Sequence, residues 1–195
     1  MKYIVIVLIA YLLGSFCASV PLSKRVCGGD VREKGSGNAG ATNMARVYGM
    51  SAGIITFALD ALKTVAAMLI GQYLGNDVGK ALAGAACIFG HCFPVYFTFR
   101  GGKGVSVGAA LGFMTSPVAF VIIAAVFFSA AVSSRKVSLG SVCAAAALPI
   151  AALLTNAGVP MLCMCIFSAA LVIFMHRGNI KRLISGTEAD FRAKK

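Results

Sequence analysis

Long, nearly uncharged apolar runs dominate this chain of 195 residues. A run of about 20 apolar residues can cross a bilayer as a helix. Here 59% of the residues are apolar and only 12% are charged, against about 25% charged in a soluble domain. A soluble fold is therefore excluded, and so is disorder, which requires low hydrophobicity. Because the runs are continuous and do not alternate apolar with polar residues, they predict an all-α polytopic membrane protein and disfavour a β-barrel.

Seven apolar segments are the predicted helices of one integral-membrane domain, residues 1–195. Their bounds are 3–22, 51–74, 80–99, 104–116, 117–134, 139–155 and 160–176. The fourth is short, and Pro117 divides it from the fifth, since proline interrupts a helix or begins one. We expect about seven transmembrane helices, one of them short. Five or six full spans is the alternative count.

The distribution of positive charge predicts the orientation. The chain has 18 Lys and Arg against six Asp and Glu, a formal charge of +12. Fifteen of the 18 lie in the C-terminal tail and in the loops after the first, third and fifth segments. Cytoplasmic loops are rich in Lys and Arg, which predicts an outside N-terminus, a cytoplasmic C-terminus and an uncleaved first span. The location is then the bacterial cytoplasmic (inner) membrane, with the site on its cytoplasmic face.

Several classes of site are not represented in the sequence. No aromatic residues interleave with the basic stretches to stack bases, so nucleic acid is not an expected partner. There is no GxSxG nucleophile elbow, no His followed five residues on by Asp, and no carboxylate cluster. The seven cysteines form no paired CxxC motif. We expect no metal and no cofactor, and the cationic polar residues instead predict an anion site.

The most informative stretch, residues 35–46, reads GSGNAGATNMAR. Its glycines can turn tightly and expose backbone N–H groups, and Arg46 can grip a phosphate with two hydrogen bonds. Thr42 or Asn43 could cap a following helix, whose N-terminus favours an anion. A flexible loop is the alternative. The candidate phosphate-binding residues are Gly35, Ser36, Gly37, Asn38, Thr42, Asn43 and Arg46.

A second cluster, residues 100–104, reads RGGKG. Bare N–H groups beside a mobile cation suit a phosphate, so Gly101, Gly102, Lys103 and Gly104 are candidates. The cluster is not the nucleotide P-loop, which requires Ser or Thr directly after the Lys. A basic loop with turn glycines is the alternative. The four-residue spacing continues to Gly108 and Gly112, which we expect to form a smooth face for helix packing.

Polar residues near the other segment ends complete the candidates. His176 and Asn179 are three apart, which places them on one helix face, and Glu188 follows in GTE. His91 is expected to be a hydrogen-bonded positioning residue. Ser141 opens the sixth segment beside a cytoplasmic loop.

Asp60 and Lys63 lie three apart inside the second segment. Ionisable groups in a span are rare and are usually paired or functional. We expect the two side chains to form a mutual ion pair, with a direct functional role as the alternative.

These clusters, in order, resemble the bacterial acyl-phosphate:glycerol-3-phosphate acyltransferases over the whole chain. The resemblance is carried by GSGNAGATN with Arg46, GHCFPVYFTFRGGKGV, SLGS at 138–141, and HRGNIKRL with GTE. It implies a seven-span enzyme of phospholipid synthesis. It also implies transfer of a fatty acyl group from acyl phosphate, not acyl-CoA, to the 1-hydroxyl of sn-glycerol 3-phosphate. The products are lysophosphatidic acid and phosphate.

The resemblance also implies roles for the candidates. Ser36, Gly37, Asn38 and Arg46 match the motif for the donor phosphate, and Lys103 matches the second phosphate loop. The positions near glycerol phosphate are Ser141, His176 and Asn179. Either His176 or a donor phosphate oxygen removes the hydroxyl proton, and we favour the donor. The expected partners are the two substrates and membrane lipid, while contact with the enzyme that makes acyl phosphate stays open. A small-anion transporter or channel is the rival function.

Overall fold

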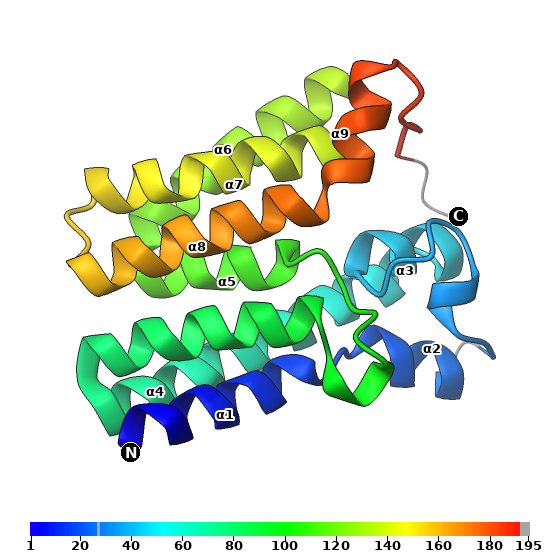
Figure 1. The fold of residues 1–195 in the computed structure, drawn as a ribbon. Helices are drawn as coiled ribbons and strands as arrows, with labels where there is room; N and C mark the ends of the chain where they lie inside the picture. Colours follow the sequence, from blue (N-terminus) through cyan, green and yellow to red (C-terminus); the bar gives the residue numbers. More distant parts are fainter. Residues whose placement is uncertain (27, 192–195) are drawn as a thin grey trace.

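The computed structural model describes residues 1–26 and 28–191, and these residues are helical throughout the bundle (Figure 1). The longer helices are α1 (Lys2–Ser15), α4 (Met50–Cys92), α5 (Val105–Thr115), α6 (Pro117–Ser134), α7 (Val137–Leu154) and α8 (Val159–Met175). The short helices are α2 (Ser19–Val26), η1 (Val31–Glu33), α3 (Ala41–Tyr48), η2 (Val95–Phe97) and α9 (Arg177–Ile184). The predicted all-α class is confirmed.

α4 consists of two arms, because its backbone is non-helical at Gly75 and Asn76. The arms lie against each other beside α1 in Figure 1. Gly71 and Gly79 allow the close approach at the turn. A Cβ added at Gly71 would lie 2.4 Å from the Gly79 carbonyl oxygen, and one added at Gly79 would lie 2.2 Å from that of Gly71. The predicted segments 51–74 and 80–99 are therefore the two arms of one hairpin.

α5 lies between two groups of helices, with α1 and α4 on one side and α6, α7 and α8 on the other (Figure 1). Its buried Val107 and Leu111 pack in one apolar cluster with Ile88 of α4 and Leu148 of α7. α6 begins directly after α5, at Pro117, and the Ser116 hydroxyl accepts a hydrogen bond from the Val118 N–H at 3.2 Å. The predicted short fourth segment and its division at Pro117 are both confirmed.

Within the described residues, four helical segments are long and apolar enough to cross a membrane: Lys2–Val26, Met50–Phe97, Pro117–Ser134 and Val137–Leu154. A fifth span results if the bent pair Val159–Met175 and Arg177–Ile184 counts as one. Because Met50–Phe97 contains the two arms of α4, each of the seven predicted segments overlaps a helix or an arm. The polytopic membrane architecture is confirmed.

Two predicted helix ends are wrong. α1 stops at Ser15, where Phe16 adopts an extended backbone (φ −73°, ψ 93°), and not at residue 22. The second arm of α4 stops at Cys92 and not at residue 99. Pro94 explains the second difference, because a proline disfavours the helical conformation of the residue before it. Hydropathy continues through both breaks, so the apolar runs did not reveal them.

The predicted packing face at Gly108 and Gly112 is correct for one residue only. A Cβ at Gly112 would lie 2.4 Å from the Ile123 Cδ1 atom, so Gly112 does permit close packing with α6. A Cβ at Gly108 would meet no atom within 4 Å. Gly108 therefore faces open space in the bundle, and its prediction as a packing glycine is wrong.

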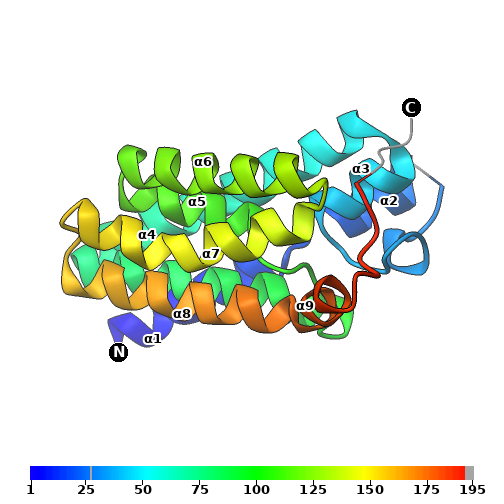
Figure 2. The ribbon, with the colours of Figure 1, turned by 90° about the horizontal axis from the view of Figure 1, so that it is seen from above.

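The short polar helices α2, α3 and α9 gather at the end of the bundle opposite the N-terminus, as Figures 1 and 2 both show. The basic loops between the spans meet at this same end. Of the basic tail residues, Arg192, Lys194 and Lys195 lie outside the described part of the chain. The fold thus brings together the residues that the sequence singles out.

Candidate active site

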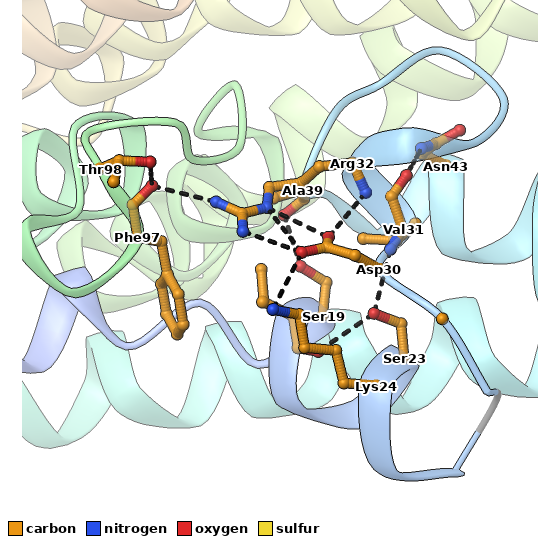
Figure 3. A network of polar contacts seen from close by, with 12 residues as sticks. Ser19, Ser23, Lys24, Asp30, Val31, Arg32, Ala39, Asn43, Phe97 and Thr98 are labelled. Carbon is orange, nitrogen blue, oxygen red and sulfur yellow. Dashed lines mark hydrogen bonds and ion pairs between the residues drawn. The ribbon is translucent and has the colours of Figure 1, made fainter.

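A carboxylate that the sequence did not flag ties the two glycine-rich loops together (Figure 3). Asp30 accepts hydrogen bonds from the backbone N–H of Arg32 at 2.9 Å and from its Nη2 at 2.8 Å, and Lys24 Nζ lies 3.3 Å away. Arg32 in turn donates from Nη1 to the Phe97 carbonyl at 3.0 Å. The guanidinium holds the pKa of Asp30 well below its usual range. This contact fixes the first loop against the segment that leads into the second.

Asn43 gives the first glycine loop its shape. Its side-chain nitrogen donates to the carbonyls of Val31, Lys34 and Asn38 at 3.0 to 3.1 Å, and its Oδ1 accepts from the Ser36 N–H at 2.9 Å. The side chain is only 1% exposed. Its hydrogen-bonding groups are therefore occupied by the loop, which differs from the predicted direct contact with phosphate.

The second glycine loop folds back onto His91. The Gly102 N–H donates to the His91 carbonyl at 3.1 Å. A Cβ at Gly101 would lie 2.0 Å from that carbonyl oxygen, so a side chain there would collide with it. Gly104 has φ +81°, which favours glycine, and is the N-cap of α5. These constraints set where the chain presents Lys103.

Lys103 begins a row of polar contacts that reaches α9. Its Nζ donates to Asn179 Oδ1 at 2.5 Å, and Asn179 Nδ2 donates to Glu188 Oε1 at 2.6 Å. Arg182 Nε completes the row at 2.6 Å from Glu188 Oε2. Burial lowers the pKa of Lys103, and the charges of Arg182 and Arg46 lower it further. The charge of Glu188 acts in the opposite direction. Lys103, Arg46 and Arg182 all line one cleft, where a bound anion would stabilise their positive charges.

Glu188 accepts contacts through both carboxylate oxygens. Burial by itself raises its pKa, but hydrogen bonds from Asn179 and Arg182 outweigh burial and hold the pKa below its usual value. The segment after α9 folds back over the α6–α7 turn, where Phe191 N–H donates to the Arg135 carbonyl at 3.1 Å. This return of the chain is what brings Glu188 to Asn179.

His176 lies at the bend between α8 and α9 and is 3% exposed. Its Nδ1 is 2.8 Å from the Val172 carbonyl oxygen. A carbonyl can only accept, so Nδ1 carries the proton and Nε2 of the neutral ring is free to accept. The Ser141 hydroxyl donates to the Val137 carbonyl at 2.9 Å.

A cleft of about 660 Å³ gathers most of the predicted residues. Those that line it are Gly35, Ser36, Asn38, Thr42, Asn43, Arg46, His91, Lys103, Ser141, His176, Asn179 and Glu188. Four predicted glycines are not among the lining residues: Gly37, Gly101, Gly102 and Gly104. The lining also includes residues that were not predicted as site residues: Ser106, Ser138, Arg182 and Thr187. Arg182 had a signal, because it is three residues after Asn179 on one helix face.

An apolar cavity of about 320 Å³ adjoins this cleft among α5, α6, α7 and α8. The two spaces share the lining residues Phe57, Val105, Phe127, Phe128 and Ser141. Gly108 lines the apolar cavity, which is the open space that a Cβ there would enter. The described residues contain no group of three His, Cys, Asp or Glu side chains that could hold a metal ion.

A helical bundle with apolar spans, a cleft lined by Arg46, Lys103 and Arg182 at one end and an apolar cavity beside it are features of an integral membrane protein. The sequence model of the glycerol-3-phosphate acyltransferase family matches residues 4–186. The chain belongs to this family.

Individual relatives cover nearly the whole chain. The glycerol-3-phosphate acyltransferase of Syntrophotalea carbinolica is 41% identical over 98% of this chain and 99% of its own length. That of Clostridioides difficile is 40% identical over 100% and 98%. Crystal structures of the integral membrane glycerol 3-phosphate acyltransferase PlsY are similar too. Its glycerol 3-phosphate form has a TM-score of 0.92 at 35% identity, and its lysophosphatidic acid form 0.91 at 34%. Both alignments cover 98% of this chain and 96% of the other.

Proposed function

We propose that this glycerol-3-phosphate acyltransferase takes its acyl group from acyl phosphate and transfers it to the 1-hydroxyl of sn-glycerol 3-phosphate. The products are lysophosphatidic acid and inorganic phosphate. One observation carries the proposal: the first glycine-rich loop, Lys103 of the second loop and Arg182 of α9 meet in a single cleft that adjoins an apolar cavity. Such a cleft suits two phosphorylated substrates, one of which carries an acyl chain. Because the chain belongs to a family of enzymes, acyl transfer is favoured over the alternative function of a small-anion transporter or channel.

The two phosphates bind to different parts of the cleft. Ser36, Asn38 and Arg46 bind the donor phosphate, with the guanidinium as a planar, two-pronged donor. Gly37, which does not line the cleft, shapes the loop between Ser36 and Asn38 through its positive φ of +70°. Lys103 binds phosphate from the second loop, and Asn179 orients it through the 2.5 Å contact. Charge-assisted hydrogen bonds contribute about 1.5–3 kcal/mol each, so two or three of them suffice to hold a small dianion at sub-millimolar affinity.

Ser141 and His176 lie beside the glycerol moiety, and Arg182 joins the cationic end of the cleft. Asn43 contributes by holding the first loop in shape, as its hydrogen bonds to that loop support. Glu188 fixes Asn179 and Arg182 in place. Gly101, Gly102 and Gly104 act through the backbone path of the second loop.

Acyl transfer here needs no covalent intermediate on the enzyme, because acyl phosphate is already an activated anhydride. The glycerol oxygen attacks the acyl carbon, the bond from that carbon to the phosphate oxygen breaks, and phosphate leaves. The cations of the cleft stabilise the charge that develops. A donor phosphate oxygen takes the hydroxyl proton. Glu188 is a poor base for this step, because its two oxygens accept from Asn179 and Arg182 and its pKa is lowered.

The acyl chain occupies the apolar cavity beside the cleft. Gly108→Leu should therefore shift the preference of the enzyme toward shorter acyl chains, since an added Cβ meets no atom within 4 Å and the side chain would extend into the apolar cavity that Gly108 lines. We expect kcat/KM for short relative to long acyl phosphates to rise about tenfold, with a smaller shift for Gly108→Ala. A series of acyl phosphates of different length measures this. If both variants keep the wild-type preference for acyl-chain length, the acyl chain does not occupy this cavity.

The cleft lies on the cytoplasmic face of the bacterial cytoplasmic membrane. The chain crosses the membrane seven times, and α5 is the short crossing. With the N-terminus outside the cell, the basic loops lie on the cytoplasmic side. The gathering of α2, α3 and α9 at the end opposite the N-terminus supports this arrangement. The whole chain, residues 1–195, acts as one domain, with membrane lipid around it and no nucleic acid bound.

The donor is the part of this proposal to test first. Purified protein in detergent is given labelled glycerol 3-phosphate with either palmitoyl phosphate or palmitoyl-CoA. We expect labelled lysophosphatidic acid with palmitoyl phosphate and none with palmitoyl-CoA, because the proposed contacts of Ser36, Asn38 and Arg46 are to a phosphate bonded directly to the acyl carbon, which a thioester lacks. Equal rates with palmitoyl-CoA would overturn the donor assignment.

A further inference from the structure

A charged pair is buried in the first arm of α4, away from the cleft. Asp60 is 0% exposed and the Lys63 side chain 8%, and Lys63 Nζ lies 2.9 Å from Asp60 Oδ1. The predicted mutual ion pair is confirmed. Ionisable groups inside a span are costly and are usually functional. Neither residue lines the cleft, so a function of this pair must act through other residues.

Lys63 also forms hydrogen bonds with backbone carbonyls at the end of α1. Its Nζ donates to the carbonyls of Gly14 at 3.0 Å and Phe16 at 2.7 Å. The last carbonyls of a helix lack intrahelical partners, and a lysine near them can supply hydrogen bonds. The ammonium thereby fixes the break between α1 and α2, which hydropathy did not predict.

The same ammonium reaches the end of the second arm of α4. Lys63 Nζ is 3.0 Å from His91 Nδ1. An ammonium only donates, so Nδ1 accepts and the proton of the neutral ring is on Nε2. That Nε2 lies against the second glycine loop, because a Cβ added at Gly102 would be 2.1 Å from it. The Gly102 N–H also donates to the His91 carbonyl, and the next residue is Lys103.

We propose that Asp60 and Lys63 are positioning residues that set the second phosphate loop through His91. Asp60 holds the Lys63 ammonium in place. The ammonium in turn holds the end of α1 and the imidazole of His91. The imidazole and the backbone carbonyl of His91 together hold Gly102. The position of Lys103 Nζ in the cleft thus depends on a charge pair buried inside the helical bundle. This inference rests on the proposed function, since it concerns how the acyl-transfer cleft is held in shape.

The test is a double-mutant cycle against Lys103→Ala. The variant Asp60→Asn with Lys63→Met removes both charges together and leaves no unpaired buried charge. We expect it to lower kcat/KM for glycerol 3-phosphate about 10- to 100-fold, the loss that a misplaced catalytic group causes. In the Lys103→Ala background the same double substitution should lower kcat/KM much less, because residues that act through one group are non-additive. A general loss of stability would instead reduce activity equally in both backgrounds.

Controls separate this inference from the proposed function. Lys80→Met makes the same change in the other arm of α4 and should keep wild-type kinetics. Thermal unfolding reports folding, and Gly102→Ala disturbs the contact with His91 from the loop side without altering a buried charge. It should lower kcat/KM and be non-additive with Lys103→Ala as well.

Wild-type kcat/KM in the Asp60/Lys63 variant, or equal losses in the two backgrounds, would overturn the inference. Inactivity of the wild type, or full activity of Lys103→Ala, would overturn the proposed function instead.

Discussion

Lys103→Ala should lower kcat/KM for glycerol 3-phosphate about a hundredfold, or about 2.7 kcal/mol. The substitution removes the cation of the second glycine loop, which is half-enclosed and donates to Asn179 at 2.5 Å. A charge-assisted contact alone contributes about 1.5–3 kcal/mol, and the loss also leaves Asn179 Oδ1 without its donor. Steady-state kinetics with both substrates varied measures the effect.

Lys181→Ala is the matched control for this result. Lys181 is an exposed lysine of α9 near the same end of the bundle, and it does not line the cleft. We expect its kinetics to match the wild type. Wild-type kinetics in Lys103→Ala, or equal losses in the two variants, would contradict the phosphate-binding role of the second loop.

His176→Ala should raise KM for glycerol 3-phosphate about tenfold or more and leave kcat within a few-fold of wild type. If a donor phosphate oxygen takes the proton, His176 only holds the acceptor, with Nε2 accepting a hydrogen bond from a glycerol hydroxyl. Its orientation comes from the 2.8 Å contact between Nδ1 and the Val172 carbonyl. Activity should therefore recover at high glycerol 3-phosphate.

The alternative for His176 has a different kinetic signature. A general base contributes about 10²- to 10⁴-fold to the rate. A fall of kcat by that factor, not restored by saturating glycerol 3-phosphate, would make His176 the base and remove the donor phosphate from that role. His176→Gln serves as a companion variant, because its side-chain oxygen can still accept a hydrogen bond but is a very weak base.

The sequence predicted the helices better than their ends. Apolar runs mark helices because each run must satisfy its backbone within the membrane. The breaks at Phe16 and Phe93 lie inside such runs. The break at Phe93 has a local cause in Pro94, but the break at Phe16 has a tertiary partner. The ammonium of Lys63, in a helix far away in the sequence, donates hydrogen bonds to the Gly14 and Phe16 carbonyls at the end of α1. No local pattern carries that information.

In the candidate site, too, some residues were recognisable from the sequence, whereas the roles of others depend on tertiary contacts. Lys103, His176 and Asn179 were recognisable because their residue types suit a phosphate and are not explained by packing. Gly108 faces a cavity and not a neighbouring helix, which its spacing in the sequence did not predict. Asn43 hydrogen-bonds its own loop, which the residue type by itself does not reveal. Asp30 has no motif around it. Its importance lies in the contact of Arg32 with Phe97, 65 residues away in the sequence.

Direct transfer within one cleft is the central claim, and phosphate release tests it most directly. Purified protein is mixed in a rapid-quench experiment with acyl phosphate, with and without glycerol 3-phosphate, and both phosphate and lysophosphatidic acid are measured. We predict no phosphate burst without glycerol 3-phosphate, and one lysophosphatidic acid for each phosphate when it is present. A burst of phosphate equal to the enzyme concentration without the acceptor would show a covalent acyl-enzyme and contradict direct transfer.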